Sequence, residues 1–493
     1  MGREHYNTWT RYRAVLTSPS LYEIAAGLDY EHPVGRPRIH PIYVLLAYGA
    51  LARIARSGIR VQLDLAEPHT WDAARTLMTQ AIARHRLDVP PPPVSPPTWE
   101  HWRWFRDHHL ATDDGLGQLA RIFTPTAVAT AHRIGLLHVD GPGSLTHPDP
   151  TRTVYGDGTL VRPIYQPPET VQLDNDDGST SLGYPDPATG QLSDTPHRRY
   201  DPDLREHHGQ LGPVLTHGYV CWHARGPRPY QRVDLAAAHI PEPGAEAATA
   251  LRLLRDVYRA AGSGIQAVVY DGAFRGTHID HVMTTYGYLV LAKQAKDAAT
   301  DTATQLVQTP SGRRARSHPL GILTHTLPNG HECGHTLATV GGRVAEIGLD
   351  EAGDPVLVAL LERSSVKRSR RTDGHFHFNV GYTIGCPQAS FTTWLSPHAT
   401  SADAQRPEYL RVIPVGDPDA DRLLGIRSDA ESFHSNYKRS LLVNRAMSLG
   451  WRRGLVDLYS YAIVNNALTE HRAAREREHG REPDHGLQAR RTA

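Results

Sequence analysis

Several features are scarce in this 493-residue sequence, and each scarcity narrows the choice of function. There are only three cysteines, Cys221, Cys333 and Cys386, which are too few and too widely spaced for a disulfide framework. The longest apolar run, residues 42–52, has eleven residues, whereas a membrane-spanning helix needs about 20. The charged first residues lack the apolar core of a signal peptide. We therefore expect a cytoplasmic protein with no membrane partner.

An excess of one charge sign is also missing. Lysine plus arginine total 53 and aspartate plus glutamate 52, which gives a formal net charge of +1. Any contact with nucleic acid must therefore come from local basic patches rather than from the whole chain. Only four of the basic residues are lysines, and the abundance of Arg, Ala, Gly and Pro fits GC-rich, bacterial coding. A lysine at a motif position is informative in such a chain.

The composition is that of a folded α/β chain with many loops. Hydrophobic residues make up 39% and charged residues 21%, with 42 glycines and 37 prolines. The length predicts about three domains. Hydropathy patterns divide the chain into helical residues 1–89, a Pro-rich linker and helical region at 90–150, the first part of a core at 151–293, a β-rich insert at 294–415, C-terminal helices of the core at 416–473, and a disordered tail at 474–493.

A short basic strip lies within the first helical region. Residues 35–38 read Gly-Arg-Pro-Arg, so Arg36 and Arg38 stand on a stiff segment before a helix pattern. Arginines of this kind fit the narrow, electronegative minor groove of DNA, which makes residues 1–89 a candidate DNA-binding region. The alternative is an ordinary loop that carries two arginines.

Three carboxylates stand out further along the chain. Asp157 and Asp271 each follow a short apolar strand pattern and precede glycine, as a metal site at a sheet edge requires; Asp-Gly is also a common turn. Glu431 lies three residues after Ser428, which matches a helix capping box. A second interpretation is that Arg427, Glu431 and Lys438 share one helix face that contacts phosphates and metal.

The segment from Arg427 to Lys438, RSDAESFHSNYK, resembles the glutamate motif of insertion-sequence DDE transposases. That motif places Arg four residues before the Glu and Lys seven after it. Residues 155–159 (YGDGT) and 270–274 (YDGAF) are similar to the strands that carry the first and second aspartates of the family. The family commonly has Tyr three residues before the Arg, where this chain has Leu424.

The resemblance implies an RNase H-like mixed-sheet catalytic core. The gap from Asp271 to Glu431 is 160 residues, against 114 from Asp157 to Asp271, so a domain must be inserted in the second gap, and residues 294–415 supply it. The implied activity is metal-dependent cleavage and strand transfer at insertion-sequence ends. The alternatives are a catalytically inactive, transposase-derived DNA-binding protein and a nuclease on the same core.

The resemblance also assigns roles to residues. Asp157, Asp271 and Glu431 would be the catalytic residues and would hold two Mg²⁺ (or Mn²⁺) ions, with carboxyl groups about 4–8 Å apart. Arg427 and Lys438 would bind DNA phosphates beside them. We expect Glu431 in the first turns of its helix. The partners would be double-stranded DNA, as element ends and target, and a second copy of the chain on that DNA, in the bacterial nucleoid.

A separate metal site is conceivable in the β-rich segment. His331, Cys333 and His335 lie within five residues, and Cys386 follows downstream. Thiol and imidazole ligands are those of a zinc site, although this spacing is not that of a standard zinc knuckle. With 30 histidines in the chain, chance clustering is the alternative.

Overall fold

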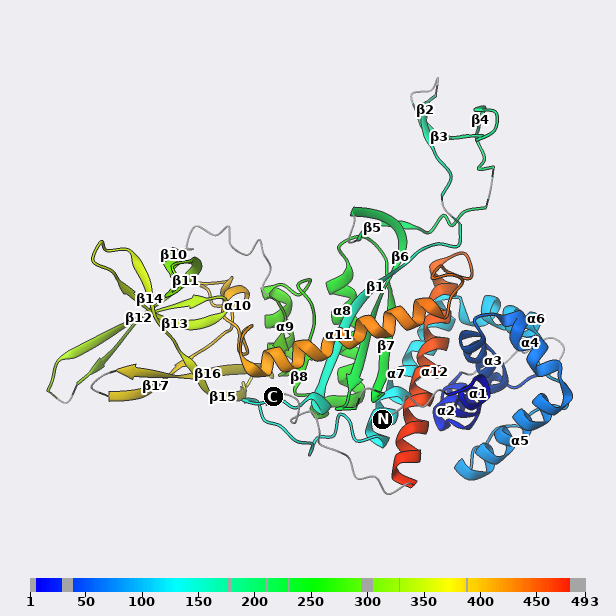
Figure 1. The fold of residues 1–493 in the computed structure, drawn as a ribbon, viewed down its shortest axis with the longest axis horizontal. Helices are drawn as coiled ribbons and strands as arrows, with labels where there is room; N and C mark the ends of the chain where they lie inside the picture. Colours follow the sequence, from blue (N-terminus) through cyan, green and yellow to red (C-terminus); the bar gives the residue numbers. More distant parts are fainter. Residues whose placement is uncertain are drawn as a thin grey trace.

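The structure is a computed structural model. It describes residues 6–28, 39–165, 167–175, 179–197, 199–209, 212–228, 230–293, 305–327, 329–386 and 389–478. These residues form a mixed α/β protein, in agreement with the predicted class. Figure 1 shows a helical region, a central sheet and a β-rich region side by side along the longest axis. Arg36 and Arg38 lie outside the described residues.

The first third of the described chain is helical. Its α-helices are α1 (Thr8–Thr17), α2 (Pro19–Gly27), α3 (Ile42–Ala55), α4 (Gly58–Ala66), α5 (Pro68–His85), α6 (Trp99–Phe105) and α7 (Asp113–Arg133). Proline occupies the first position of α5, where its fixed φ and missing N–H suit a helix start. Trp102 is buried over Gly49, where an added Cβ would lie 2.5 Å from the ring. This aromatic is therefore a core residue, whereas Trp104 is exposed.

A mixed sheet forms the centre of the molecule. Its main strands are β1 (Thr153–Val161), β6 (Gly212–Arg225), β7 (Arg232–Ile240), β8 (Ala267–Val269) and β9 (Leu289–Leu291). The order is β7-β6-β1-β8-β9, and β5 (Arg205–Gly209) pairs with the start of β6. Strand β6 is antiparallel to β1 and β7, whereas β8 is parallel to β1 and β9 is parallel to β8. Helices α8 (Glu246–Ala261) and α9 (Gly276–Tyr286) connect β7 to β8 and β8 to β9.

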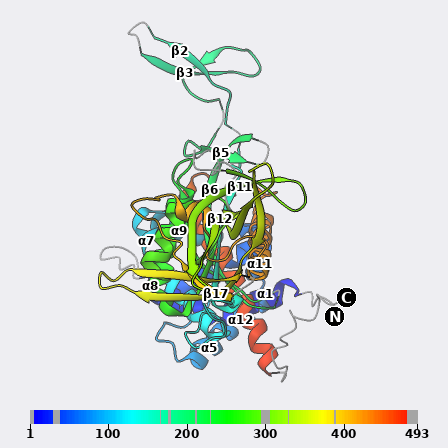
Figure 2. The same cartoon turned by 90° about the vertical axis from the view of Figure 1, so that its left-hand side faces the viewer.

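The polar segment after β1 stays away from the core. It forms a small sheet of β2 (Val171–Asp174), β3 (Thr180–Pro185) and β4 (Leu192–Ser193), most of whose residues are exposed. Figures 1 and 2 both show this sheet standing clear of the body of the molecule.

Strands dominate the segment between β9 and the C-terminal helices. Strands β10 (Gln305–Gln308), β11 (Arg314–Thr326), β12 (Glu332–Val340), β13 (Arg343–Leu349) and β14 (Pro355–Leu360) close into a barrel. Strands β15 (Glu362–Arg370), β16 (Phe376–Cys386) and β17 (Ala389–Leu395) form a three-stranded sheet, and the short helix α10 (Arg406–Tyr409) follows. Both lie beyond one end of the central sheet, so its strand order is not interrupted (Figure 1).

Two long helices complete the chain, α11 (Pro418–Arg439) and α12 (Trp451–Glu478). The expectation that Glu431 lies in the first turns of its helix is wrong. Asp417 caps the helix by accepting from the Asp419 N–H, and Pro418 follows it, so α11 starts well before Glu431. Ser428 is inside the helix, which also rules out the capping-box interpretation.

Helix α12 lies between the sheet and the N-terminal helices, in contact with β7 on one side and with α1 and α3 on the other (Figure 1). It extends to Glu478, so residues 474–478 of the predicted disordered tail are helical, and 479–493 lie outside the described residues. Within the described ranges no single helix has the length and apolar character of a membrane span. Among the described helices, the bent pair α3 and α4, with an angle of 110° between them, meets the test of length and apolar character jointly.

Candidate functional site

Asp157 and Asp271 lie at matching positions relative to two neighbouring parallel strands, Asp157 within β1 and Asp271 just past the end of β8. In the register of β1 and β8, Tyr155 pairs with Val269, and each aspartate stands two residues beyond this pair. Strand β8 ends at Val269, whereas β1 continues past Asp157. The backbone therefore brings two carboxylates together at the same edge of the sheet.

Helix α11 supplies the groups that hold Asp157. The carboxylate oxygen Oδ1 accepts from Arg427 Nη1 at 2.8 Å, and Oδ2 lies 3.5 Å from His434 Nδ1. Asp157 is only 8% exposed. Its burial opposes ionisation, but the interactions with His434 and Arg427 hold its pKa below the usual range for an aspartate. The carboxylate is thus ionised at neutral pH and already faces one fixed cation.

Lys438 lies on the same side of α11 as Arg427 and His434. Residues 427, 434 and 438 are separated by seven and four positions, which places them within one helical stripe. Burial lowers the pKa of Lys438, and the attraction of Asp157 acts in the opposite direction. Arg427, His434 and Lys438 therefore form a basic stripe beside Asp157, and His434 is a member that the sequence interpretation missed.

Glu246 is a third carboxylate at this edge, and sequence reasoning did not single it out. It is the first residue of α8, and its Oε1 accepts from the Tyr270 hydroxyl at 3.0 Å. Burial raises the pKa of Glu246 to about 7, and the negative charges of Asp271 and Asp157 add to this effect. An acidic residue at a helix start is common for electrostatic reasons, so the sequence carries no specific signal for it.

Glu431 occupies the middle of α11 and is exposed. It follows Arg427 by one turn and precedes His434 by three residues, so residues that contact Asp157 flank it on both sides. Within the described ranges its side chain makes no hydrogen bond or ion pair. Glu431 therefore stands on the solvent side of the stripe that faces Asp157, free to turn toward a ligand.

A group of side chains of the kinds that bind soft metal ions lies next to Asp157. One potential ligand atom from each of Cys221, His223 and His434 falls within 4.8 Å of the others, and all three residues are buried. His223 Nδ1 lies 2.6 Å from Asp234 Oδ1. These side chains join Asp157 through His434 to the interior of the sheet. They leave no exposed ligand position for a substrate.

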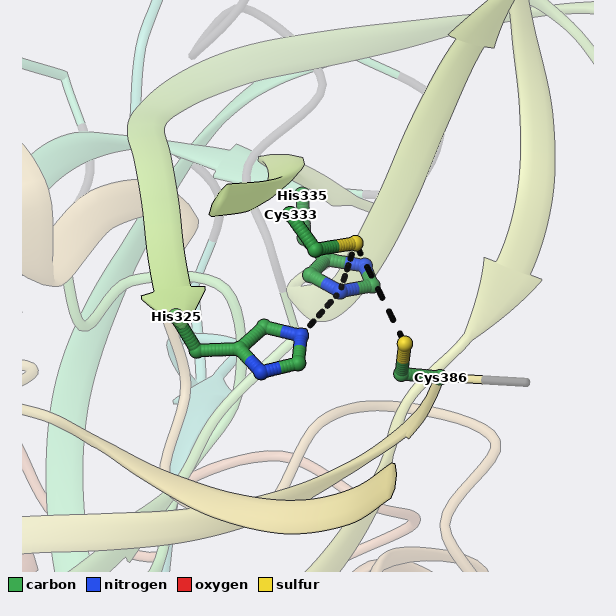
Figure 3. A group of neighbouring side chains, drawn as sticks. All are labelled: His325, Cys333, His335 and Cys386. Carbon is green, nitrogen blue, oxygen red and sulfur yellow. Dashed lines mark hydrogen bonds between the residues drawn. The ribbon is translucent and has the colours of Figure 1, made fainter. Parts of the chain in front are cut away.

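The β-rich segment holds a separate group, and it differs from the predicted one in one member. His325, Cys333, His335 and Cys386 converge, each offering a ligand atom within 4.8 Å of the others (Figure 3). The expectation for His331 is wrong. This residue is exposed in the turn before β12, where its carbonyl accepts from the Leu327 N–H. Antiparallel pairing brings in His325 from β11 instead, which local spacing cannot reveal.

Comparison of the chain with family models, with curated proteins and with solved structures found no match.

Proposed function

We propose that this chain is a metal-dependent DNA transposase of the DDE type with an RNase H-like core. One observation carries the proposal: Asp157 on β1 and Asp271, just past the end of β8, each stand two residues beyond the same pair of the adjacent parallel strands, and Arg427 of the neighbouring helix holds Asp157. Glu431 lies one turn after Arg427 on that helix, and in the proposal its exposed side chain would turn toward the two aspartates when metal binds.

The carboxylates suit hard divalent cations. Asp157, Asp271 and Glu431 would hold two Mg²⁺ or Mn²⁺ ions, since such ions favour a few carboxylates together with water and phosphate oxygens. Glu246 supports this assignment by position: its carboxyl lies close enough to Asp271 and Asp157 for their negative charges to add to the effect of burial on its pKa, and a cation would relieve that repulsion. Bound in this way, the ions supply Lewis acidity to the phosphate and to the attacking oxygen.

The chain's own residues orient the DNA. In the proposed reaction, water attacks a phosphorus atom and breaks its bond to the 3′ oxygen, and the resulting 3′ hydroxyl then attacks a target phosphodiester, so one P–O bond forms as another breaks. Lys438 would contact a flanking phosphate as a point charge and Arg427 as a planar fork. Arg427 is bound to Asp157 here, so it would exchange that carboxylate for a phosphate when metal and DNA bind.

The test uses the full-length protein and a DNA duplex that ends in the inverted repeats flanking its gene. With Mg²⁺ or Mn²⁺ we expect strand cleavage and joining of the cut end to a plasmid. Asp157→Asn, Asp271→Asn and Glu431→Gln should each lower cleavage by at least about 100-fold and leave DNA affinity within a few-fold. A matched control is Glu351→Gln, an exposed glutamate in a turn of the β-rich segment.

The outcomes separate the proposal from its two rivals. Cleavage without joining would favour a nuclease on this core. DNA binding without cleavage by the unaltered protein would favour an inactive derivative, to which Leu424 in place of the family's tyrosine would then be relevant. Normal cleavage by Asp157→Asn would refute the metal site itself. We also propose that two copies of the chain bind the DNA together. Light scattering of the purified protein–DNA complex should then give a mass that corresponds to two chains.

A further inference from the structure

The four side chains in the β-rich segment come from three strands of two different sheets. His325 lies near the end of β11 and pairs directly with Cys333 on β12 in the antiparallel register. His335 follows Cys333 by two residues, so both point to the same face of β12. Cys386 is the last residue of β16, in the neighbouring three-stranded sheet. Figure 3 shows the two thiols and two imidazoles directed toward one another.

Their separations match those of a tetrahedral metal site. Cys333 Sγ lies 3.9 Å from Cys386 Sγ and 3.5 Å from His335 Nε2, and the two Nε2 atoms of His335 and His325 are 3.3 Å apart. Ligands placed tetrahedrally at the usual zinc distances would be separated by about 3.8 Å for two sulfurs, about 3.6 Å for sulfur and nitrogen, and about 3.3 Å for two nitrogens. A disulfide is excluded, because its sulfurs must be about 2.05 Å apart.

The surroundings also fit a metal ligand set. His335 Nδ1 lies 2.7 Å from Glu346 Oε1 on β13, which leaves Nε2 directed at the thiols. Carboxylates commonly accept from the second ring nitrogen of a metal-bound histidine and fix its orientation. The Phe391 ring packs against His325 and His335, with centroids 4.4 and 5.8 Å away. His335 and Cys386 are buried and the other two are half-buried.

We propose that His325, Cys333, His335 and Cys386 bind one Zn²⁺ ion that fastens the barrel to the sheet of β15–β17. Two thiolates and two imidazoles in a tetrahedron favour zinc over harder cations. All four positions are filled by protein, which is the property of a structural rather than a catalytic zinc site. The ion would tie the end of the β11–β12 hairpin to the end of β16, two places that share no strand pairing.

The first experiment measures metal in the unaltered full-length protein. Protein purified in reductant without chelators should contain about one zinc per chain by mass spectrometry of the metal. Replacement of zinc by Co²⁺ should produce the visible bands of tetrahedral cobalt and the near-ultraviolet bands of thiolate ligation. These spectra need no variant and so do not depend on the folding of a mutant. Less than about 0.1 zinc per chain, with no thiolate bands after reconstitution, would overturn the proposal.

Variants then assign the site. His325→Ala and Cys333→Ser should lose the zinc, whereas His331→Ala, a nearby exposed histidine, should retain it. Asp157→Asn should retain it as well, which separates this ion from those of the proposed catalytic site. If Cys333→Ser keeps a full equivalent of zinc, the metal is bound elsewhere, for instance by Cys221, His223 and His434, and the assignment is wrong.

Discussion

The carboxyl group of Glu246 lies directly against the backbone of Gly158. A Cβ atom added at position 158 would stand 2.7 Å from the Glu246 Cδ atom, closer than such contacts occur in proteins. The glycine after the first aspartate is thus needed for a second carboxylate to approach, and not only for a turn. Gly158 is inside β1, where its neighbours Asp157 and Thr159 are both buried.

Gly158→Ala should therefore displace Glu246 and impair the metal site while the sheet persists. We expect the apparent affinity for Mg²⁺ to fall about tenfold or more, measured by titration of cleavage activity with metal. Gly117→Ala, where an added Cβ meets nothing within 4 Å, is the control: it should leave activity unchanged and, inside α7, stabilise the protein by about 0.5–1 kcal/mol. An unaltered Mg²⁺ requirement in Gly158→Ala would show that Glu246 does not contribute.

The titration of Glu246 predicts a pH dependence. Its pKa is raised from 4.5 to about 7, so the folded protein binds this proton more tightly than the unfolded chain does. The resulting stability is complete below about pH 4.5 and is lost as the pH rises through about 7, by an amount of order 1–3 kcal/mol. Because metal binding requires the ionised carboxylate, Mg²⁺ affinity should rise over the same interval.

Glu246→Gln should flatten both pH profiles. Chemical unfolding without metal at several pH values measures the first, and isothermal titration with Mg²⁺ measures the second. Glu362→Gln, an exposed glutamate at the start of β15, should reproduce the unaltered profiles. Identical profiles for Glu246→Gln and the unaltered protein would assign the pH dependence to another group.

Arg427 competes with metal for Asp157, and its removal should have opposite effects on two ligands. Arg427→Gln should bind Mg²⁺ several-fold more tightly, because a fixed cation 2.8 Å from the carboxylate is gone. It should bind DNA more weakly, with the slope of log affinity against log salt smaller by about 1. Arg439→Gln, an exposed arginine in the last turn of the same helix, is the control. Weaker Mg²⁺ binding by Arg427→Gln would contradict the competition.

A buried ion pair fastens α12 to the N-terminal helices. Arg53 Nη2 lies 3.6 Å from Asp457 Oδ1, and both side chains are at most 4% exposed. Asp457→Ala should lower the free energy of unfolding by about 3–5 kcal/mol, because it leaves a buried arginine uncompensated. The double variant Arg53→Met/Asp457→Leu should recover most of this loss. Denaturant unfolding of the three proteins measures it, and a loss below about 1 kcal/mol in Asp457→Ala would mean that water reaches Arg53.

Strong local patterns predicted the elements that position the site. Apolar runs before Asp157 and Asp271 predict strands, and the structure has β1 and β8 there. The start of α11 differs from the prediction, although Asp417 followed by Pro418 is a helix-start signal, because Ser428 and Glu431 also match a capping box and predict a later start. Local spacing is sufficient where a feature depends on neighbours in sequence.

Long-range pairing determined what the sequence could not predict. Glu246 joins the aspartates only because α8 starts beside β1, and His325 replaces His331 only because β11 pairs with β12 in one particular register. The role of His434 depends likewise on the packing of α11 against β1. In each case the residue type was visible, but its partners are set by tertiary structure.

The position of α12 has a consequence for how the protein is made. A chain leaving the ribosome presents α1 and α3 early, yet part of the surface that covers them belongs to a helix that begins at Trp451. The face of α3 that carries Arg53, whose partner Asp457 lies on α12, must wait through the synthesis of the sheet and the barrel before that cover arrives. A chain stopped short of α12 therefore leaves part of the surface of α1 and α3 uncovered, which favours its recognition by chaperones and proteases.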